Sequence, residues 1–238
     1  MKTMLVLSMG ALLLAGTLSA QTPVPEWQAG VDKMKSLIQT NPAQASEEVG
    51  ELLKGKNKKN VDLVTSVAHV YLDAGKLTEA QEYLAMAKKA DNKDPKVSVL
   101  EGDIALAQKN IGQACQLYEQ AIYFDPNCKE AYLKYAQAYK SASPALAIEK
   151  LEQLKAVDPN CLEADRELAE VYYSSNRFGK AAEMYAKFID TPLATEDDML
   201  KYAFALFLNH DFEKSLQVAQ KGLQKNARHA AFNRLVMY

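Results

Sequence analysis

A pattern of small residues returns along this chain about every 34 positions, and it restricts the available folds more than any other feature. Residues 125–140 and 158–173 are identical at eight of sixteen positions when they are aligned. Small residues recur in two series, at Ala68, Gly102, Ala136, Ala169 and Ala203 and at Ala80, Ala114, Ala147, Ala181 and Ser215. A chain that repeats a unit of this length builds an array of like units, each packed on its neighbours.

Each unit is predicted to contain two amphipathic helices. Larger side chains follow the small residues at spacings of three and four, as Tyr71 follows Ala68, and these are helical spacings. Short turns such as residues 74–76 separate the two helices, and pairs such as Asp125-Pro126 end the unit, because proline cannot continue a helix. A small residue lets two helices approach closely. The sequence therefore predicts an all-α protein of tandem helix–turn–helix units.

At these positions the chain resembles the tetratricopeptide repeat family, whose unit is a helix–turn–helix of 34 residues. The resemblance covers five units, 61–94, 95–128, 129–161, 162–195 and 196–228. The tryptophan that is usual early in the family's first helix is absent from all five. The resemblance implies an α-solenoid wound as a right-handed superhelix. It also implies a non-enzymatic scaffold that holds a protein or peptide segment in its concave groove and needs no cofactor.

The segments that flank the five units do not follow the repeat pattern completely. Residues 21–60 are predicted to form a degenerate helical pair that caps the array, since terminal units of such arrays are atypical. Trp27 and Met34 belong to its first apolar stripe, and Pro42 begins its second helix. Residues 229–238 have the pattern of a further first helix. Either this helix is itself the C-terminal cap, or the chain is a fragment of a longer protein.

The first twenty residues have the pattern of a secretory signal peptide. Lys2 supplies one positive charge, Met4 to Leu18 is apolar or small, and Ala20 is a small residue at the predicted cut. An uncleaved anchor is the alternative, but the apolar run is shorter than the ~20 residues that span a bilayer. We therefore expect an exported bacterial protein of the periplasm or cell envelope. It has no membrane span after cleavage, and peripheral association with the envelope stays open.

Charge and motifs exclude several classes of function. Twenty-eight basic residues stand against thirty acidic ones, a net charge of −2, so a nucleic-acid binder driven by phosphate attraction is not expected. No catalytic residue, metal ligand or cofactor site is predicted, because the three histidines and three cysteines lack the necessary spacings.

Cys128 and Cys161 occupy equivalent sites in neighbouring units. These sites are too far apart for the ~7 Å limit of a disulfide, so free thiols are expected.

Helical geometry separates a packed face from a second face, at about 100° per residue. In tetratricopeptide arrays that second face of the first helices lines the concave groove. The candidate partner-binding residues on it are His69, Asp73, Asp103, Gln137, Lys140, Arg166, Glu170, Tyr173, Phe204 and Phe207. The lysines and asparagines with which some family members clamp a terminal carboxylate are absent from the matching positions. The co-chaperone role that accompanies this clamp is therefore not implied.

Two questions stay open at this point. The last unit presents four apolar residues to the groove, Leu200, Phe204, Phe207 and Leu208. They are either covered by further C-terminal helices or form an apolar docking site for a partner helix or tail. The function is read as that of a scaffold in cell-envelope assembly or secretion. The alternative is the sensing portion of a larger signalling protein or enzyme.

Overall fold

The computed structural model describes residues 24–237, so the predicted signal peptide, residues 1–20, lies outside the described residues. Within 24–237 the chain forms thirteen α-helices and one 3₁₀ helix, with no strand. The helices are α1 (Gln28–Leu37), α2 (Pro42–Leu52), η1 (Gly55–Lys59), α3 (Val61–Asp73), α4 (Leu77–Ala90), α5 (Pro95–Ala107), α6 (Ile111–Phe124), α7 (Lys129–Tyr139), α8 (Pro144–Val157), α9 (Leu162–Ser174), α10 (Phe178–Phe188), α11 (Glu196–Leu208), α12 (Phe212–Lys225) and α13 (Ala230–Val236). The all-α prediction is confirmed.

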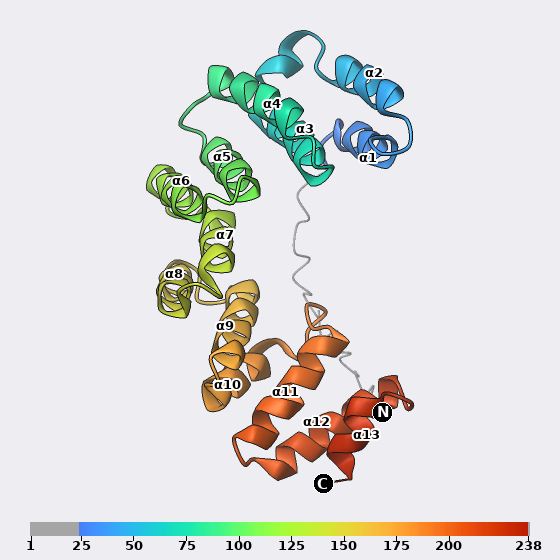
Figure 1. Ribbon diagram of the computed structural model, residues 1–238, viewed down its shortest axis with the longest axis vertical. Helices are drawn as coiled ribbons and strands as arrows, with labels where there is room; N and C mark the ends of the chain where they lie inside the picture. Colours follow the sequence, from blue (N-terminus) through green and yellow to red (C-terminus); the bar gives the residue numbers. More distant parts are fainter. Residues whose placement is uncertain (1–23, 238) are drawn as a thin grey trace, which may run out of the picture.

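The helices follow one another along a curved array (Figure 1). Each helix packs mainly on its neighbours in the chain, and the first helices also stack on one another, α3 on α5, α5 on α7 and α7 on α9. In Figure 1, α5 and α7 lie on the inner side of the arc and α6 and α8 on the outer side. The array is therefore a solenoid in which the first-helix layer forms a concave face.

The turns between paired helices repeat one backbone conformation. The residue seven positions after the first small residue has a positive φ in four units, at Gly75 (74°), Lys109 (64°), Asn176 (57°) and His210 (64°). In the turn after α3, Gly75 N–H donates to Leu72 O and Lys76 N–H to Tyr71 O, both at 2.9 Å, which is the Schellman arrangement that closes a helix. The third unit has one residue fewer, and its corresponding residue, Ser143, has φ −150°. The missing residue is thus a turn residue.

The small residues lie where helices cross. Ala68, Ala136, Ala169 and Ala203 are at most 1% exposed. Gly102 takes the same position in the second unit, and a Cβ atom built there would lie 2.5 Å from Cε1 of Tyr118. The Tyr118 ring is fully buried, so it fills the space that the other units give to a methyl group. The absence of a side chain at Gly102 is therefore what lets the Tyr118 ring pack there.

Gly102→Ala is expected to destabilise the protein by about 1–2 kcal/mol. Overpacking of a core costs roughly 1–3 kcal/mol, and the better helix propensity of alanine offsets part of this. The matched control is Gly50→Ala, because Gly50 lies in α2 with nothing within 4 Å of its added Cβ. Gly50→Ala should stabilise by roughly 0.5–1 kcal/mol. Urea denaturation followed by circular dichroism measures both, and a gain in stability from Gly102→Ala would contradict the packing argument.

The two ends of the array are closed in different ways. At the N-terminal end, Met34 of the predicted stripe is buried against α2 and α3 together with Val31 and Ile38, whereas Trp27 is only half-buried. At the C-terminal end, Phe232 of α13 is fully buried. A Cβ atom at Gly222 of α12 would lie 2.6 Å from the Phe232 ring. The small residue of α12 is therefore where α13 packs.

The four apolar groove residues predicted in α11 differ in how far they are buried. Leu200, Phe204 and Phe207 are half-buried and pack against the core formed by α11, α12 and α13. Leu208 remains 44% exposed. Part of the apolar surface that the sequence assigned to the last groove unit is thus covered by α13.

Candidate functional site

The inner face contains a buried carboxylate that joins three first helices. Asp103 of α5 is only 7% exposed. The hydroxyl of Tyr118 donates to Asp103 Oδ1 at 2.7 Å, and Lys134 Nζ of α7 donates to Oδ2 at 2.9 Å. His69 Nε2 of α3 lies 3.1 Å from the same Oδ2. We call His69, Asp103, Tyr118 and Lys134 the Asp103 cluster; it connects α3, α5 and α7.

The electrostatics of the Asp103 cluster fix its protonation pattern. Burial on its own raises the pKa of Asp103. The hydrogen bond from His69, the charge of Lys134 and the hydrogen bonds from Tyr118 and Lys134 outweigh burial and hold this pKa below its usual value. Burial and the neighbouring carboxylate raise the pKa of Tyr118. At neutral pH the carboxylate is therefore an ionised acceptor, and the tyrosine hydroxyl keeps the proton that it donates.

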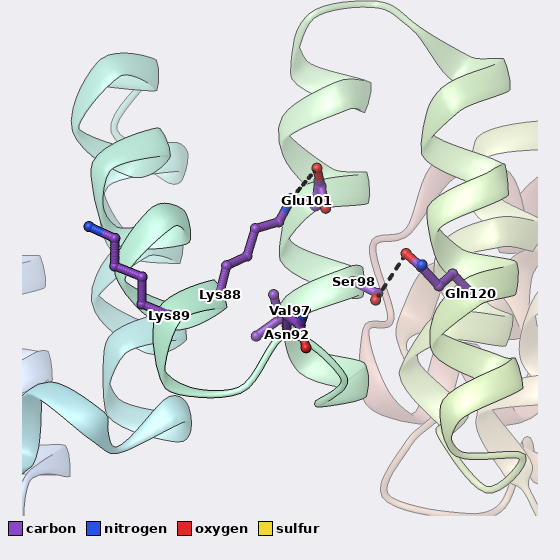
Figure 2. A pocket seen from close by; sticks show the side chains of 7 residues that line it. All are labelled: Lys88, Lys89, Asn92, Val97, Ser98, Glu101 and Gln120. Carbon is purple, nitrogen blue, oxygen red and sulfur yellow. Dashed lines mark hydrogen bonds and ion pairs between the residues drawn. The ribbon is translucent and has the colours of Figure 1, made fainter.

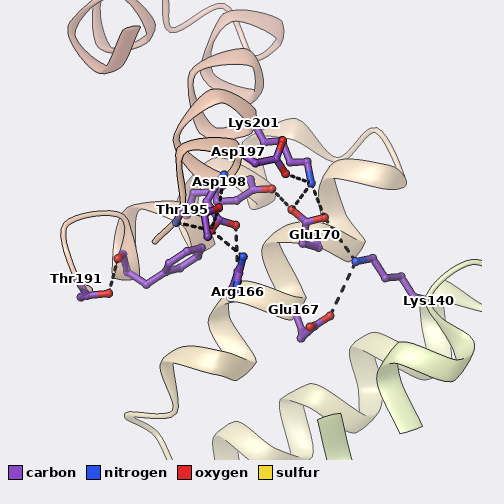
Figure 3. A network of polar contacts seen from close by, with 11 residues as sticks. Lys140, Arg166, Glu167, Glu170, Thr191, Thr195, Asp197, Asp198 and Lys201 are labelled. Atoms are coloured by element: carbon purple, nitrogen blue, oxygen red, sulfur yellow. Dashed lines mark hydrogen bonds and ion pairs between the residues drawn. The ribbon is translucent and has the colours of Figure 1, made fainter. Parts of the chain in front are cut away.

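A second cluster of the same kind lies further along the inner face (Figure 3). Tyr185 OH donates to Glu170 Oε1 at 2.7 Å, and Lys201 Nζ lies 3.0 and 2.9 Å from the two carboxylate oxygens of Glu170. Nζ of Lys140, the residue that follows α7, lies 3.5 Å from Glu170 Oε2. We call Lys140, Glu170, Tyr185 and Lys201 the Glu170 cluster; it connects α7, α9 and α11.

The two clusters are related by an offset of two units. Asp103 and Glu170, Tyr118 and Tyr185, and Lys134 and Lys201 are each separated by 67 residues. The two acids are among the predicted groove residues, whereas neither the tyrosines nor the lysines were predicted. Comparison of the sequence with itself at 67 residues would have found them, whereas comparison of adjacent units could not.

Arg166 is also held by a buried acid. Its Nε and Nη2 atoms donate to the carboxylate of Asp198 at 3.1 and 3.0 Å, and Asp198 is 1% exposed. Asp198 closes a capping box with Thr195 at the start of α11. Burial raises the pKa of Asp198, but the hydrogen bonds from Thr195 and the charge of Arg166 hold it below its usual value. Arg166 thus joins α9 to α11 (Figure 3).

The remaining predicted residues differ in exposure. Asp73 and Gln137 are exposed, and Gln137 Nε2 donates to Glu167 Oε1 at 2.9 Å. Tyr173 and Phe207 are half-buried. Each makes an edge-on ring contact within its own unit, Tyr173 with Phe178 and Phe207 with Phe212, at 5.7 and 5.3 Å between centroids. Of the ten candidates, His69 and Asp103 lie together, and so do Lys140 and Glu170.

Two pockets flank this surface. The first, of about 400 Å³, lies at the N-terminal end of the inner face between the segment before α1 and helices α3, α5 and α7. The second, of about 330 Å³, lies between α4, α5 and α6 (Figure 2). In the second pocket Lys88 donates to Glu101 at 2.6 Å and Ser98 to Gln120 at 3.4 Å. Its polar groups therefore bond mainly to one another.

The described residues offer little for redox or metal chemistry. Cys115, Cys128 and Cys161 are free thiols, the first and last of them buried. Burial and the nearby Glu119 raise the pKa of Cys115 to about 11, so this thiol is protonated at neutral pH. Between residues 24 and 237 no group of three or more His, Cys, Asp or Glu residues is arranged to hold a metal ion. In the same range no helix has the length and apolar character needed to cross a membrane.

Comparison with solved structures gives the same architecture. PilW, a widely conserved type IV pilus biogenesis factor, superposes with a TM-score of 0.66 at 17% identity, over 89% of this chain and 98% of PilW. PilF of Pseudomonas aeruginosa gives 0.63 at 16% identity, over 87% and 95%. YrrB, a tetratricopeptide repeat protein with an unusual peptide-binding site, gives 0.57 at 14% identity, over 79% and 97%. At these identities the likeness is one of fold.

The family assignment comes from the sequence. No curated protein matches the chain. The profile of the tetratricopeptide repeat matches residues 65–128 and 137–194, together just over half of the sequence. This match confirms the resemblance drawn from the repeated small residues, and the chain belongs to the tetratricopeptide repeat family.

Proposed function

We propose that this protein is a non-enzymatic scaffold that binds a protein or peptide segment along the inner face of its array. The observation that carries the proposal is the first-helix surface on which α3, α5, α7 and α9 stack in succession and which the Arg166–Asp198 ion pair joins to α11. The buried acids keep this surface in one arrangement, and exposed polar side chains such as Gln137 and Asp73 remain available on it. A rigid concave surface with mixed polar groups suits an extended segment.

The process that we propose is assembly or secretion in the cell envelope, after export directed by residues 1–20. Similarity in fold to a type IV pilus biogenesis factor supports this choice, and the apolar N-terminal run supports export. The division of the chain into a cap at 21–60, five repeats over 61–228 and a further helix start at 229–238 belongs to the same proposal.

Photo-crosslinking at single positions tests where the partner binds. Benzoylphenylalanine is placed on the inner face at Asp73 or Gln137, and on outer helices at Glu82 of α4 or Glu149 of α8; all four residues are exposed. Substitution at exposed sites leaves the buried ion pairs intact, which charge reversal at Arg166 or Glu170 would not. Adducts recovered from the envelope fraction of irradiated cells are expected from the two inner positions and not from the two outer ones. Equal yields from both faces would contradict groove binding.

A further inference from the structure

We propose that the pocket at the N-terminal end of the inner face is a subsite for a cationic side chain, arginine or lysine, of the bound segment. The inference rests on the proposed function and adds the chemistry of one contact to it. The pocket has a volume of about 400 Å³, enough for one large side chain. Five of its lining residues carry the argument, Trp27, Asp62, His69, Lys96 and Glu130.

The charged side chains of the pocket do not balance. Lys96 of α5 donates to Asp62 of α3, so these two groups form an ion pair. Glu130 of α7 is exposed, and its carboxylate makes no hydrogen bond or ion pair with any residue between 24 and 237. Its charge acts on Lys96 through space. Two carboxylates thus face one ammonium group, and the pocket holds one negative charge in excess.

An aromatic side chain forms part of the pocket wall. Trp27 is half-buried and packs on the core of the N-terminal units, and it also lines the pocket. An indole attracts a cation through its ring electrons, with about 0.5–1 kcal/mol at exposed sites and more when water is excluded. The same ring attracts an anion much less, and an anion would also meet Glu130. Charge and aromatic surface therefore favour the same kind of ligand group.

His69 also lines the pocket. His69 Nδ1 lies 3.0 Å from Thr65 O, and His69 Nε2 lies 3.1 Å from Asp103 Oδ2. Both ring nitrogens therefore lie within hydrogen-bond distance of protein oxygens, and the tautomer decides which of them donates. The hydroxyls of Thr65 and Ser66, which also line the pocket, donate to backbone carbonyls of α3. Glu130 and the indole of Trp27 are therefore the side chains that can receive a cationic group. An arginine side chain that pairs with Glu130 and lies against Trp27 uses both.

Trp27 is the only tryptophan of the chain, so its fluorescence reports on this pocket directly. The probe is N-acetyl-arginine amide, titrated at constant ionic strength against N-acetyl-citrulline amide, which has a similar shape and no charge. The arginine probe is expected to give a saturable change in Trp27 emission. Its half-saturating concentration should be at least about threefold lower than that of the citrulline probe.

Matched variants identify the carboxylate. Glu130→Gln is expected to raise the half-saturating concentration of the arginine probe by about three- to tenfold. The control is Glu163→Gln, because Glu163 pairs with Lys129 outside the pocket; it should leave the titration unchanged. Circular dichroism confirms that both variants fold. Identical curves for the two probes, or no effect of Glu130→Gln, would overturn the subsite.

The two proposals can fail independently. If the arginine probe gives no specific signal while crosslinks still form at Asp73 and Gln137, the groove function stands and the cationic subsite is wrong. A saturable response to N-acetyl-phenylalanine amide, with none to the arginine probe, would make the pocket an aromatic subsite and would likewise overturn the inference.

Discussion

Phe232→Ala should lower the stability of the C-terminal end of the array by about 3–5 kcal/mol, the range for truncation of a buried aromatic side chain. Phe232 is fully buried, and its ring fills the space left by Gly222. Without the ring, α13 loses its main contact with α12. A helix of seven residues has no stability of its own in water. We therefore expect α13 to detach.

Hydrogen exchange measures this effect locally. Amides of α12 and α13 should lose protection in the Phe232→Ala variant, while those of α3 and α4 keep it, because each unit of a repeat array contacts only its neighbours. The control is Met237→Ala, since Met237 is 79% exposed. Unchanged protection in α13 of the Phe232→Ala variant would show that other contacts hold this helix.

The repeat register predicted the fold because it depends on local spacing. Ala136 and Ala169 are buried at helix crossings as their positions required, and the turn predicted at residues 74–76 separates α3 from α4. Outside the five units the repeat register does not predict which residues are buried. Trp27, predicted in the apolar stripe of the first helix, packs on the core of the N-terminal units but is only half-buried and also lines a pocket. The degenerate helical pair has no residues equivalent to those of the five units. The side of its helices on which Trp27 lies could therefore not be predicted by comparison with them.

The site was predicted less completely than the fold. The angle around a single helix predicts Asp103 and Glu170 on a common face, yet it gives no information on which side chains reach them from other helices. Tyr118 and Lys134 are 15 and 31 residues from Asp103. Their contact depends on how α5, α6 and α7 pack. Asp103, predicted as a groove contact, is only 7% exposed and lies against Tyr118, Lys134 and His69.

Asp103→Ala should lower the free energy of unfolding by about 2–3 kcal/mol at neutral pH. Removal of the acceptor leaves the hydroxyl of Tyr118 buried without a partner, and it also removes the counter-charge of Lys134. Loss of one member of a buried ion pair costs roughly 3–5 kcal/mol. Lys134 is 34% exposed, so water recovers part of that energy. Asp73→Ala, at an exposed site, is the control for loss of a carboxylate.

The acid dependence of stability separates charge from packing at this site. The pKa of Asp103 is lower in the folded protein than its usual value, so the unfolded chain binds the proton more tightly. Its stabilisation is therefore complete above about pH 5 and decreases as the pH falls through the folded pKa. The Asp103→Asn variant keeps the side-chain size but cannot titrate. Urea denaturation at pH 7 and pH 3 should therefore give a large difference between wild type and Asp103→Asn at pH 7 and a smaller one at pH 3. Equal differences at the two pH values would mean that packing, and not the ionised carboxylate, stabilises this junction of α3, α5 and α7.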